Sequence, residues 1–470
     1  MSSITLQQLI RDQFGFVPTA EQQSLIQGLE EFTLKQGGHN VLLINGYAGT
    51  GKTSLLAAYL KTMKDIRQKT KIMAPTGRAA KVISVKAGQD AFTIHKLIYR
   101  RKSKADLGSP ISLNVNLHKN TVFVVDEASM IGDYTMTKDG NVGARNLLED
   151  LFEFVFSGAG CKLILLGDVG QLPPVGSDHS PALNKDYLDS HFPSLHLSFF
   201  SLTEVVRQSK ESGILANATM LRSITSMADL KIEPTEDLIR LNGSELQEEL
   251  EDAYHQVGSD ETIIITRSNK RANLYNQQIR GRILWFEEEL CSGDILMVVK
   301  NNYFWMGDES KMGFIANGEL LTVKRIMKYE ELYGFRFARI LGVFVDYPDL
   351  GEQELLLLME SLEVEGPSIS RARLKDLFFE VEKDYMHERN KKKRYEKILS
   401  NPYFNALQVK YAYAVTCHKS QGGQWSRVFI DQGFVPEDQR GPDYFRWLYT
   451  AITRAADRVY LVNFEEAFFS

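Results

Sequence analysis

A phosphate-binding loop is the feature that most constrains what this chain can fold into. Residues 46–53 have the sequence Gly-Tyr-Ala-Gly-Thr-Gly-Lys-Thr and directly follow an apolar run at 41–44. In such a loop, glycines let backbone N–H groups approach phosphate oxygens, and the following helix favours negative charge at its N-terminus. Residues 54–60 have the composition of that helix. The pattern predicts a strand, a loop and a helix that hold a nucleotide; the alternative is a glycine-rich turn.

Each part of the loop has a predicted task. The Lys52 ammonium group would reach the β- and γ-phosphates, and the Thr53 hydroxyl would hold Mg²⁺. The residues of this loop that are predicted to contact the nucleotide are Gly46, Ala48, Gly49, Thr50, Gly51, Lys52 and Thr53.

Length, charge and cysteine content narrow the class of protein. The 470 residues allow about three domains. A net charge of −5 argues against a protein that coats nucleic acid by bulk electrostatics, although it leaves room for a basic channel. The three cysteines are far apart and show no metal-ligand spacing. The N-terminal sequence is unlike a secretion signal and no apolar run is long enough to span a bilayer, so we expect a cytoplasmic protein without a membrane partner.

Alternating strand-like and helix-like segments predict parallel sheets. Such alternation is typical of βαβ units whose sheet is covered by helices on both faces. The first series of predicted strands is 41–44, 71–74, 122–125 and 163–166. The second series has strands at 262–266, 409–416, 428–431 and 459–462, with helices at 269–282 and near 444–456. Within the second series, short β-rich runs and a charged helical stretch predict an inserted domain; they lie at 295–299, 320–326, 335–345 and 371–399.

Two adjacent carboxylates, Asp126 and Glu127, follow the predicted strand at 122–125. Because the carboxyl ends of parallel strands share one edge of the sheet, both would lie beside the phosphate loop. Asp126 would anchor Mg²⁺, and Glu127 would orient and activate the attacking water. The pair therefore predicts hydrolysis of the nucleotide; the alternative is an acidic turn after a core strand.

Three further residues complete the predicted catalytic set. Gln171 follows the strand at 163–166, where its amide could bond both the γ-phosphate and the attacking water. Arg207 and Arg454 come from outside the first α/β unit. If both reach the γ-phosphate across a cleft between domains, they would stabilise the charge that develops in phosphoryl transfer. An isolated arginine is usually a surface residue, so both assignments depend on the surrounding motifs.

These blocks, in this order, resemble the motifs of superfamily 1 helicases over nearly the whole chain. Gln22, in Thr-Ala-Glu-Gln, resembles the adenine-reading Q motif, and residues 415–422 resemble motif V. The segment around Arg454 resembles motif VI. The resemblance implies that the nucleotide is ATP and adds Gln22 and Gly422 to its contacts. The residues that it implies for nucleic-acid binding, in and near motifs Ia, Ib and V, are Pro75, Thr76, Gly77, Arg78, Thr93, His95, Thr416, His418 and Lys419.

The sequences of two motifs resemble the forms found in one branch of the superfamily. Gly-Asp-x-x-Gln-Leu-Pro-Pro at 167–174 and Thr-x-His-Lys-Ser-Gln-Gly at 416–422 are forms of the 5′-to-3′ branch, which contains Dda-like, RecD-like and Pif-type helicases. This resemblance implies an α/β fold with two RecA-like P-loop domains, a strand-separating β-hairpin called the pin, and an SH3-like β-rich insertion. Tyr99 is a weak candidate for the pin's wedge, with a structural role preferred. The implied divisions are 1–206 for the first RecA-like domain with the pin at about 95–120, 207–290 and 405–470 for the second, and 291–404 for the insertion.

The implied function is that of an ATP-dependent DNA helicase that moves 5′ to 3′ on single-stranded DNA in replication, repair or recombination. The implied partners are single-stranded DNA and tailed or forked duplex DNA, with a single-strand-binding or replication protein as a further candidate, and the chain would act as a monomer. One alternative is an RNA or ribonucleoprotein remodelling helicase of the same superfamily, because the motifs contact phosphates and do not exclude a 2′-hydroxyl. Another is a nucleotide-gated clamp that binds nucleic acid without unwinding it. A nucleotide kinase is disfavoured by the second RecA-like half.

Overall fold

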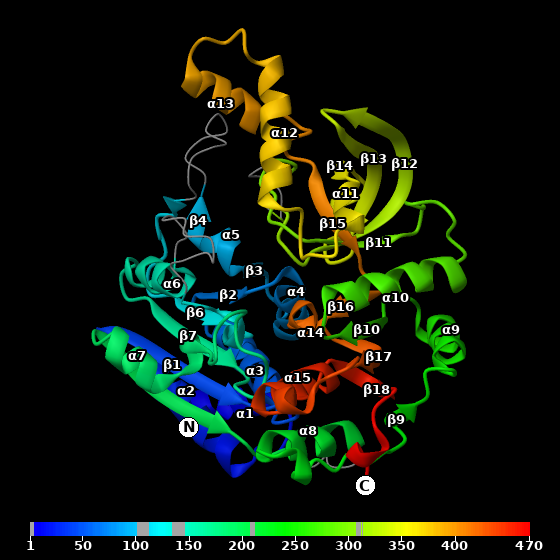
Figure 1. The fold of residues 1–470 in the computed structure, drawn as a ribbon. Coiled ribbons are helices and arrows are strands. Elements are labelled where there is room, and N and C mark those ends of the chain that lie inside the picture. The colour runs from blue at the N-terminus through cyan, green and yellow to red at the C-terminus, as the bar shows by residue number, and fades with distance from the viewer. Residues whose placement is uncertain (1–3, 101–111, 134–145, 207–211, 307–311, 313) are drawn as a thin grey trace.

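The structure, a computed structural model, describes residues 4–100, 112–133, 146–206, 212–306, 312 and 314–470. Two α/β lobes lie side by side, and a β-barrel lies above the second one (Figure 1). We call the described part of 4–206 the first lobe, 212–290 with 412–470 the second lobe, and the described part of 291–411 the barrel domain. Among the described residues, no helix combines the length and the apolar composition that crossing a bilayer requires.

The first lobe contains a six-stranded parallel sheet in the order β3-β2-β6-β7-β1-β8. Its strands are β1 (His39–Gly46), β2 (Thr70–Ala74), β3 (Ala91–Thr93), β6 (Val122–Val125), β7 (Lys162–Gly167) and β8 (Leu195–Leu202). Its helices are α1 (Leu6–Phe14), α2 (Ala20–Leu34), α3 (Lys52–Asp65), α4 (Gly77–Ala87), α5 (Ile94–Ile98), α6 (Leu147–Phe156) and α7 (Lys185–His191). A two-stranded antiparallel hairpin, β4 (Tyr99–Arg100) and β5 (Ser112–Leu113), lies outside the sheet.

Burial on both faces explains why the strand sequences are continuously apolar. Successive side chains of a strand point to opposite faces of the sheet. Leu42 and Ile44 of β1 belong to one buried cluster together with residues of α2 and α3. Val41 and Leu43 belong to the opposite cluster together with residues of α6. The core therefore forms two layers around a fixed sheet, and the loops at the strand ends are left free to carry function.

The second lobe repeats this architecture with a five-stranded parallel sheet in the order β16-β10-β17-β18-β9. Its strands are β9 (Leu238–Leu241), β10 (Thr262–Thr266), β16 (Ala414–Thr416), β17 (Trp425–Asp431) and β18 (Ala455–Val462). Its helices are α8 (Gly213–Ser223), α9 (Leu246–Val257), α10 (Asn269–Arg282), α14 (Cys417–Ser420) and α15 (Pro442–Ile452). The two parallel sheets and the inserted β-rich domain confirm the predicted fold class.

The barrel domain is a closed barrel of five strands, β11 to β15 in sequence order. All neighbouring strands pair antiparallel except β14 and β15, which run parallel. The strands are β11 (Ile295–Val298), β12 (Leu320–Leu332), β13 (Phe335–Phe344), β14 (Gln353–Leu358) and β15 (Leu407–Tyr411). The stretch at 371–399 forms two of its helices, which pack on the barrel through buried side chains. The helices are α11 (Glu360–Glu363), α12 (Arg371–Asp384) and α13 (Lys391–Leu399).

One predicted strand, at 409–416, is divided between two sheets. β15 pairs with β11 and β14 in the barrel, whereas β16 pairs with β10 in the second lobe. Ala412 and Tyr413, which connect β15 to β16, are both buried. The apolar composition therefore continues through the crossing, and no polar turn marks it. As a consequence the barrel extends past residue 404.

Candidate nucleotide site and nucleic-acid track

The phosphate loop joins β1 to α3, and two of its glycines stand where neighbouring side chains leave no room for a Cβ atom. Gly49 and Gly51 have φ values of 75° and 76°, a region that glycine adopts without strain. A Cβ atom on Gly51 would lie 2.7 Å from the Gln22 Nε2 atom, and one on Gly49 would lie 2.9 Å from Leu215. Gly51 is also the N-cap of α3, and no side chain caps this helix. The N-terminus of α3 is therefore free to receive an anion.

The predicted carboxylate pair lies at the end of β6, at the same edge of the sheet. Asp126 is buried, and its Oδ1 atom accepts a hydrogen bond from the Glu127 backbone N–H at 2.9 Å. Glu127 has a φ of 55°, an uncommon conformation for a residue with a side chain. Its Oε2 atom is buried without a hydrogen-bond partner. Strained backbone and an unpaired buried oxygen are features of functional sites rather than of stable cores.

The charge balance of this pair fits a divalent cation. Burial, and then the neighbouring charge of Glu127, raises the pKa of Asp126 to about 7, although Lys52 acts in the opposite direction. A cation bound there would favour the ionised carboxylate and reverse that rise. No group of three or more His, Cys, Asp or Glu residues that could hold a metal ion occurs in the described part of the chain. A site made of Thr53, Asp126, phosphate oxygens and water needs no such group, and Mg²⁺ prefers this kind of ligand set.

A cavity of about 330 Å³ between the two lobes brings most of the predicted nucleotide-site residues together. The second lobe contributes Arg454, which is buried and lies directly after α15 and its C-cap. Its guanidinium group now donates to the backbone carbonyls of Thr450 and Gly423, at 3.1 and 3.3 Å. The predicted residues that line this cavity are Ala48, Gly49, Lys52, Thr53, Asp126, Glu127, Gln171, Gly422 and Arg454. Arg207 lies outside the described residues.

The remaining predicted nucleotide contacts lie close to this cavity. Gln171 is buried, and its Oε1 atom has no partner, as a group waiting for a ligand would be. Gln22 lies in an adjacent cavity with Gly51, but its amide already donates to the Thr50 carbonyl at 2.9 Å. Gly46 and Thr50 are buried within the loop and shape it rather than line either cavity.

Sequence reasoning missed several residues of this region. The adjacent cavity has Phe16 and Tyr47 in its wall, so aromatic rings stand beside the phosphate loop. The Arg222 guanidinium lies 4.1 Å from the centre of the Tyr47 ring. Lys86 of α4 lines both cavities. Only Tyr47 stands inside a recognisable motif, at a position where the motif allows any residue, so the pattern gave no signal for these side chains.

Two protein-family models match the two lobes in the order in which they occur. The model described as "AAA domain" matches residues 19–242, and the model described as "UvrD-like helicase C-terminal domain" matches residues 411–462. In both lobes the chain is similar to superfamily 1 helicases. The second match includes the predicted motif V and Arg454, which lines the same cavity as the phosphate loop.

Individual relatives are remote in sequence but extend over much of the chain. The ATP-dependent RecD2 DNA helicase of Deinococcus radiodurans is 23% identical over 94% of this chain, which spans 50% of that protein. The ATP-dependent DNA helicase Dda of Enterobacteria phage T4 is 25% identical over 67% of this chain and 68% of its own length. A crystal structure of Pif1 helicase from Bacteroides with ADP-AlF3 and single-stranded DNA covers 97% of this chain and 95% of that chain, with 15% identity and a TM-score of 0.49.

The residues predicted to contact nucleic acid lie at or just after the ends of strands in the two sheets. Residues 75–78 follow β2, Thr93 is the last residue of β3, and His95 lies in α5. Thr416 is the last residue of β16, and residues 417–419 lie in α14. Burial lowers the pKa of His95, so its ring is neutral near pH 7 and suits stacking or hydrogen bonding. The hydroxyls of Thr76 and Thr93 cap α4 and α5, whereas that of Thr416 makes no capping bond. His418 is exposed.

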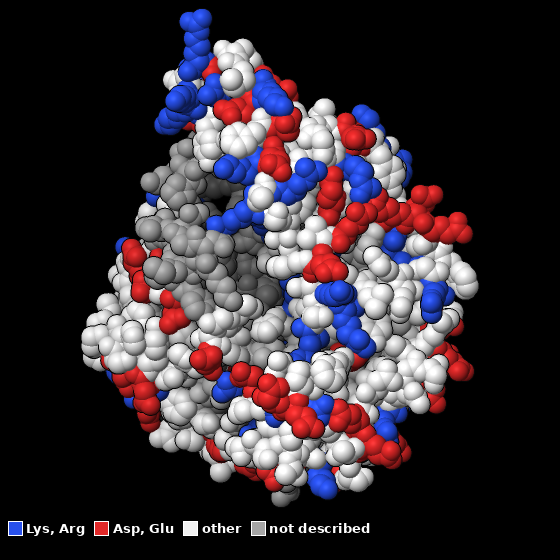
Figure 2. All heavy atoms as spheres, in the orientation of Figure 1, with Lys and Arg blue, Asp and Glu red and all other residues white. Residues whose placement is uncertain are grey.

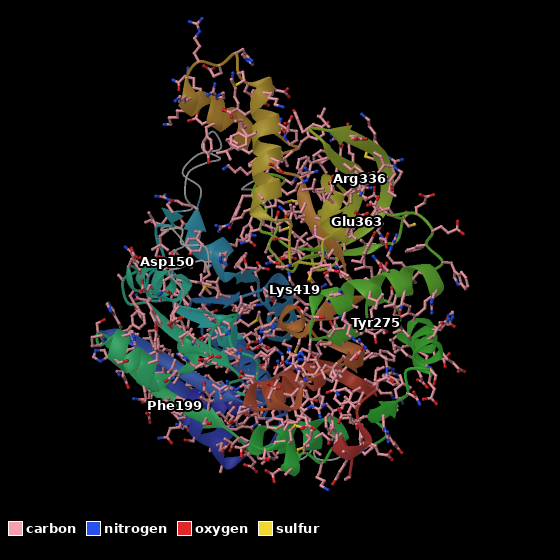
Figure 3. All side chains as sticks on the ribbon, in the orientation of Figure 1. Asp150, Phe199, Tyr275, Arg336, Glu363 and Lys419 are labelled. Carbon is pink, nitrogen blue, oxygen red and sulfur yellow. The ribbon has the colours of Figure 1, made fainter. Side chains whose placement is uncertain are left out.

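Three parts of the molecule meet at the start of α4, which we call the α4 junction. From the second lobe, the Gln424 carbonyl accepts a hydrogen bond from Arg78 at 2.7 Å, and the Trp425 ring lies 4.1 Å below that guanidinium. Beside it, the second lobe contacts the barrel domain, where the Asn317 side-chain oxygen accepts a hydrogen bond from Lys419 at 2.8 Å. Figure 3 shows Lys419 near the centre of the molecule. A Cβ atom on Gly77 would lie only 2.0 Å from the Glu319 carboxyl group. The predicted track is therefore lined from three sides.

The pin lies largely outside the described residues, because 101–111 are not described. Of its flanks, Tyr99 donates a hydrogen bond to Asp150 of α6 at 2.7 Å, and the rings of Tyr99 and His95 lie 5.5 Å apart. Figure 3 shows Asp150 on the first lobe, beside the hairpin. A ring tied to its own lobe in this way favours the structural role for Tyr99 over that of a wedge.

Glu319 is expected to make the stability of the folded protein fall as pH rises. The carboxyl group is buried, its Oε2 atom has no partner, and burial raises its pKa to about 8, helped by Asp346 and opposed by Lys81. The folded state therefore holds a proton that the unfolded state releases above its ordinary pKa of 4.5. Stability should drop progressively as pH rises from there through about 8, by a few kcal/mol in all.

Thermal denaturation of the Glu319→Gln variant at pH 6 and pH 9 tests this expectation. The neutral amide needs no proton, so the drop in Tm between the two pH values should be smaller than in the native chain by on the order of 5 °C. Glu331→Gln is the matched control, because Glu331 lies exposed on β12, the strand that begins directly after Glu319. Equal pH dependence in all three proteins would contradict the assignment.

Proposed function

We propose that this chain hydrolyses ATP in the cleft between its lobes and uses the resulting lobe movement to travel along single-stranded DNA and separate duplexes. The single observation that carries the proposal is that Arg454 of the second lobe lines the same cavity as Lys52, Asp126 and Glu127 of the first. A protein that only bound the nucleotide would need neither a hydrolytic carboxylate nor a cation from a second lobe. Both are needed when hydrolysis must depend on closure of the cleft.

The residues of the cleft divide the chemistry between them. Lys52 and the N–H groups of the phosphate loop would hold the β- and γ-phosphates, and Thr53 and Asp126 would hold Mg²⁺. Mg²⁺, when bound, supplies charge neutralisation at the phosphate oxygens. Glu127 would orient the attacking water and take its proton, with the Gln171 amide fixing that water. Arg454 would stabilise the developing charge once the cleft closes.

DNA as the track and 5′-to-3′ movement are the further parts of the proposal. They are supported by the similarity to RecD2 and Dda, which are ATP-dependent DNA helicases, and by the resemblance of the motifs to the 5′-to-3′ branch. Figure 2 shows a face on which basic and acidic side chains are mixed, which suits a locally lined track better than a uniformly basic surface. Action as a monomer, and a single-strand-binding or replication protein as partner, belong to the same proposal.

Two measurements on the purified chain test this function. ATP hydrolysis should rise when single-stranded DNA is added, and rise less with RNA of the same sequence. Strand separation should require ATP and a 5′ single-stranded tail, so that blunt and 3′-tailed duplexes of equal length stay intact. Stimulation by RNA alone would favour the RNA-remodelling alternative, and hydrolysis without any strand separation would favour the clamp.

Lys419 is expected to contribute one phosphate contact to the DNA track. Removing it in Lys419→Ala should weaken single-stranded DNA binding and lower the slope of log K against log salt by about 1, independently of base sequence. Fluorescence anisotropy with labelled oligonucleotides over a salt series measures both quantities. Lys185→Ala is the control, because Lys185 pairs with Asp189 on α7, away from the track. An unchanged slope in Lys419→Ala would remove Lys419 from the track.

A further inference from the structure

Helix α15 presents one polar face to the first lobe. The Arg446 guanidinium donates to the Asp178 carbonyl at 2.9 Å, and the Thr450 hydroxyl accepts from the Leu172 backbone N–H at 2.8 Å. Tyr449 stands between them in the sequence, and residues three and four apart lie on the same side of a helix. Figure 1 shows α15 along the boundary between the lobes. Movement of the second lobe must therefore act on these contacts.

The Tyr449 hydroxyl contacts the phosphate loop itself. It accepts a hydrogen bond from the Ala48 backbone N–H at 2.9 Å and donates to the Asp168 carboxylate at 2.6 Å. The side chains of Tyr449 and Asp168 are almost completely buried. Ala48 belongs to the loop whose N–H groups would hold phosphate, so a side chain of the second lobe occupies one of the donors that the nucleotide needs.

The same carboxylate also attracts the loop lysine. Lys52 Nζ lies 3.9 Å from Asp168 Oδ2 and donates to the Tyr47 carbonyl at 3.3 Å. Asp168 further accepts from the Gly170 backbone N–H at 2.9 Å, which fixes the carboxylate in place. Two phosphate-binding groups, the Ala48 N–H and the Lys52 ammonium, are thus engaged by one connected pair, Tyr449 and Asp168.

We propose that Tyr449 is a positioning residue that competes with the nucleotide phosphates for the phosphate loop and transmits the outcome to Arg454. The inference rests on the proposed function. When a phosphate group binds the Ala48 N–H and Lys52, the Tyr449 hydroxyl retains only its hydrogen bond to Asp168. The face of α15 that Tyr449 anchors is then released from the phosphate loop. Arg454 follows the C-cap of this helix by one residue. Occupancy of the loop is thereby coupled to the position of the cation across the cleft.

The substitution Tyr449→Phe removes one hydroxyl and separates two effects that a merely structural residue would change together. Without the competing contact, ATP should bind more tightly, so KM for ATP should fall by about threefold. Without the anchor, Arg454 should be placed less accurately, so kcat at saturating DNA should fall by about tenfold. A variant that was simply less well folded would lose kcat without gaining affinity for ATP.

The chain contains a matched control on the same helix. Tyr444 is equally buried, but its hydroxyl donates to Gln432 within the second lobe. Tyr444→Phe therefore removes the same atom from α15 without touching the cleft, and its KM and kcat should match those of the native chain. Asp168→Asn changes the partner of Tyr449 in the first lobe and should also lower both KM and kcat. If Tyr449→Phe does not fold, this variant tests the same contact.

The outcomes separate this inference from the proposed function. If the native chain shows no DNA-stimulated hydrolysis, the proposed function fails, and the competition is then tested by the Kd of fluorescent ATP alone. If the native chain hydrolyses ATP and Tyr449→Phe lowers both KM and kcat while Tyr444→Phe does not, the inference holds. If Tyr449→Phe equals the native chain, raises KM, or behaves as Tyr444→Phe does, the inference is overturned while the motor function stands.

Discussion

Replacing Glu127 by Gln is expected to lower kcat for ATP hydrolysis at saturating DNA by about 10²- to 10⁴-fold. The amide has the size of the carboxylate but takes no proton from the attacking water. The buried Oε2 atom of Glu127 has no hydrogen-bond partner among the described residues, so the substitution breaks no such bond at this atom. ATP binding should persist, because Lys52, Thr53 and the loop N–H groups are unchanged. Steady-state hydrolysis and equilibrium binding of a fluorescent ATP analogue measure the two quantities.

The control for this variant is Glu153→Gln, on the exposed face of α6 in the same lobe. It should hydrolyse ATP at the native rate. If Glu127→Gln kept full turnover, another group would have to activate the water and the assignment of this carboxylate would be wrong. If it lost ATP binding altogether, Glu127 would belong to the binding site and its role in the chemical step would remain undemonstrated.

Replacing Arg454 by Ala is expected to have an effect of similar or greater size. Arginines that stabilise the transferred phosphoryl group contribute about 10³- to 10⁵-fold in rate. Here the loss should appear in kcat and in duplex unwinding, with ATP binding affected less, because the guanidinium acts only when the cleft closes. Arg454→Lys should recover little, since an ammonium group lacks the planar, multiple donors of a guanidinium.

A control variant and a stability measurement are needed to interpret the activity of Arg454→Ala. Arg282→Ala removes an exposed arginine of the second lobe, on α10, and should leave hydrolysis unchanged. Thermal denaturation reports whether Arg454→Ala has lost the contacts to Thr450 and Gly423 at a cost in stability. A folded Arg454→Ala protein that hydrolyses ATP at the native rate would show that the second lobe supplies no catalytic cation at this position.

The parts of the site that depend on one strand and its loop could be predicted from the sequence. Asp126 follows β6 directly and Lys52 begins α3 at the end of the loop after β1, and parallel strands place such residues at one edge of the sheet. That Arg454 lies opposite them followed only from the motif resemblance, because no local pattern relates residues more than 300 positions apart. The contact of Tyr449 with Ala48 was not predictable at all, since it depends on how two separately folded lobes meet.

Other predictions were limited because a short sequence pattern can fit two different structures. Thr19-x-x-Gln22 fits an adenine-reading motif and also fits a capping box. The structure contains the capping box, with the Thr19 N–H donating to Gln22 Oε1 and the Gln22 N–H donating to the Thr19 hydroxyl. The division of 409–416 between two sheets was hidden for a similar reason, because buried apolar residues continue through the crossing.

The way in which the barrel is inserted has a mechanical consequence. Both of its connections, before β11 and after β15, run into the second lobe, so the barrel must follow that lobe as it swings. Yet its loops also press on the first lobe, where Glu319 meets Gly77, and Lys81 pairs with Asp346. If the lobes move as proposed above, the barrel must slide against the first lobe at these contacts. Hydrolysis of the terminal phosphate of ATP would thus move the barrel relative to the first lobe, next to the bound nucleic-acid strand.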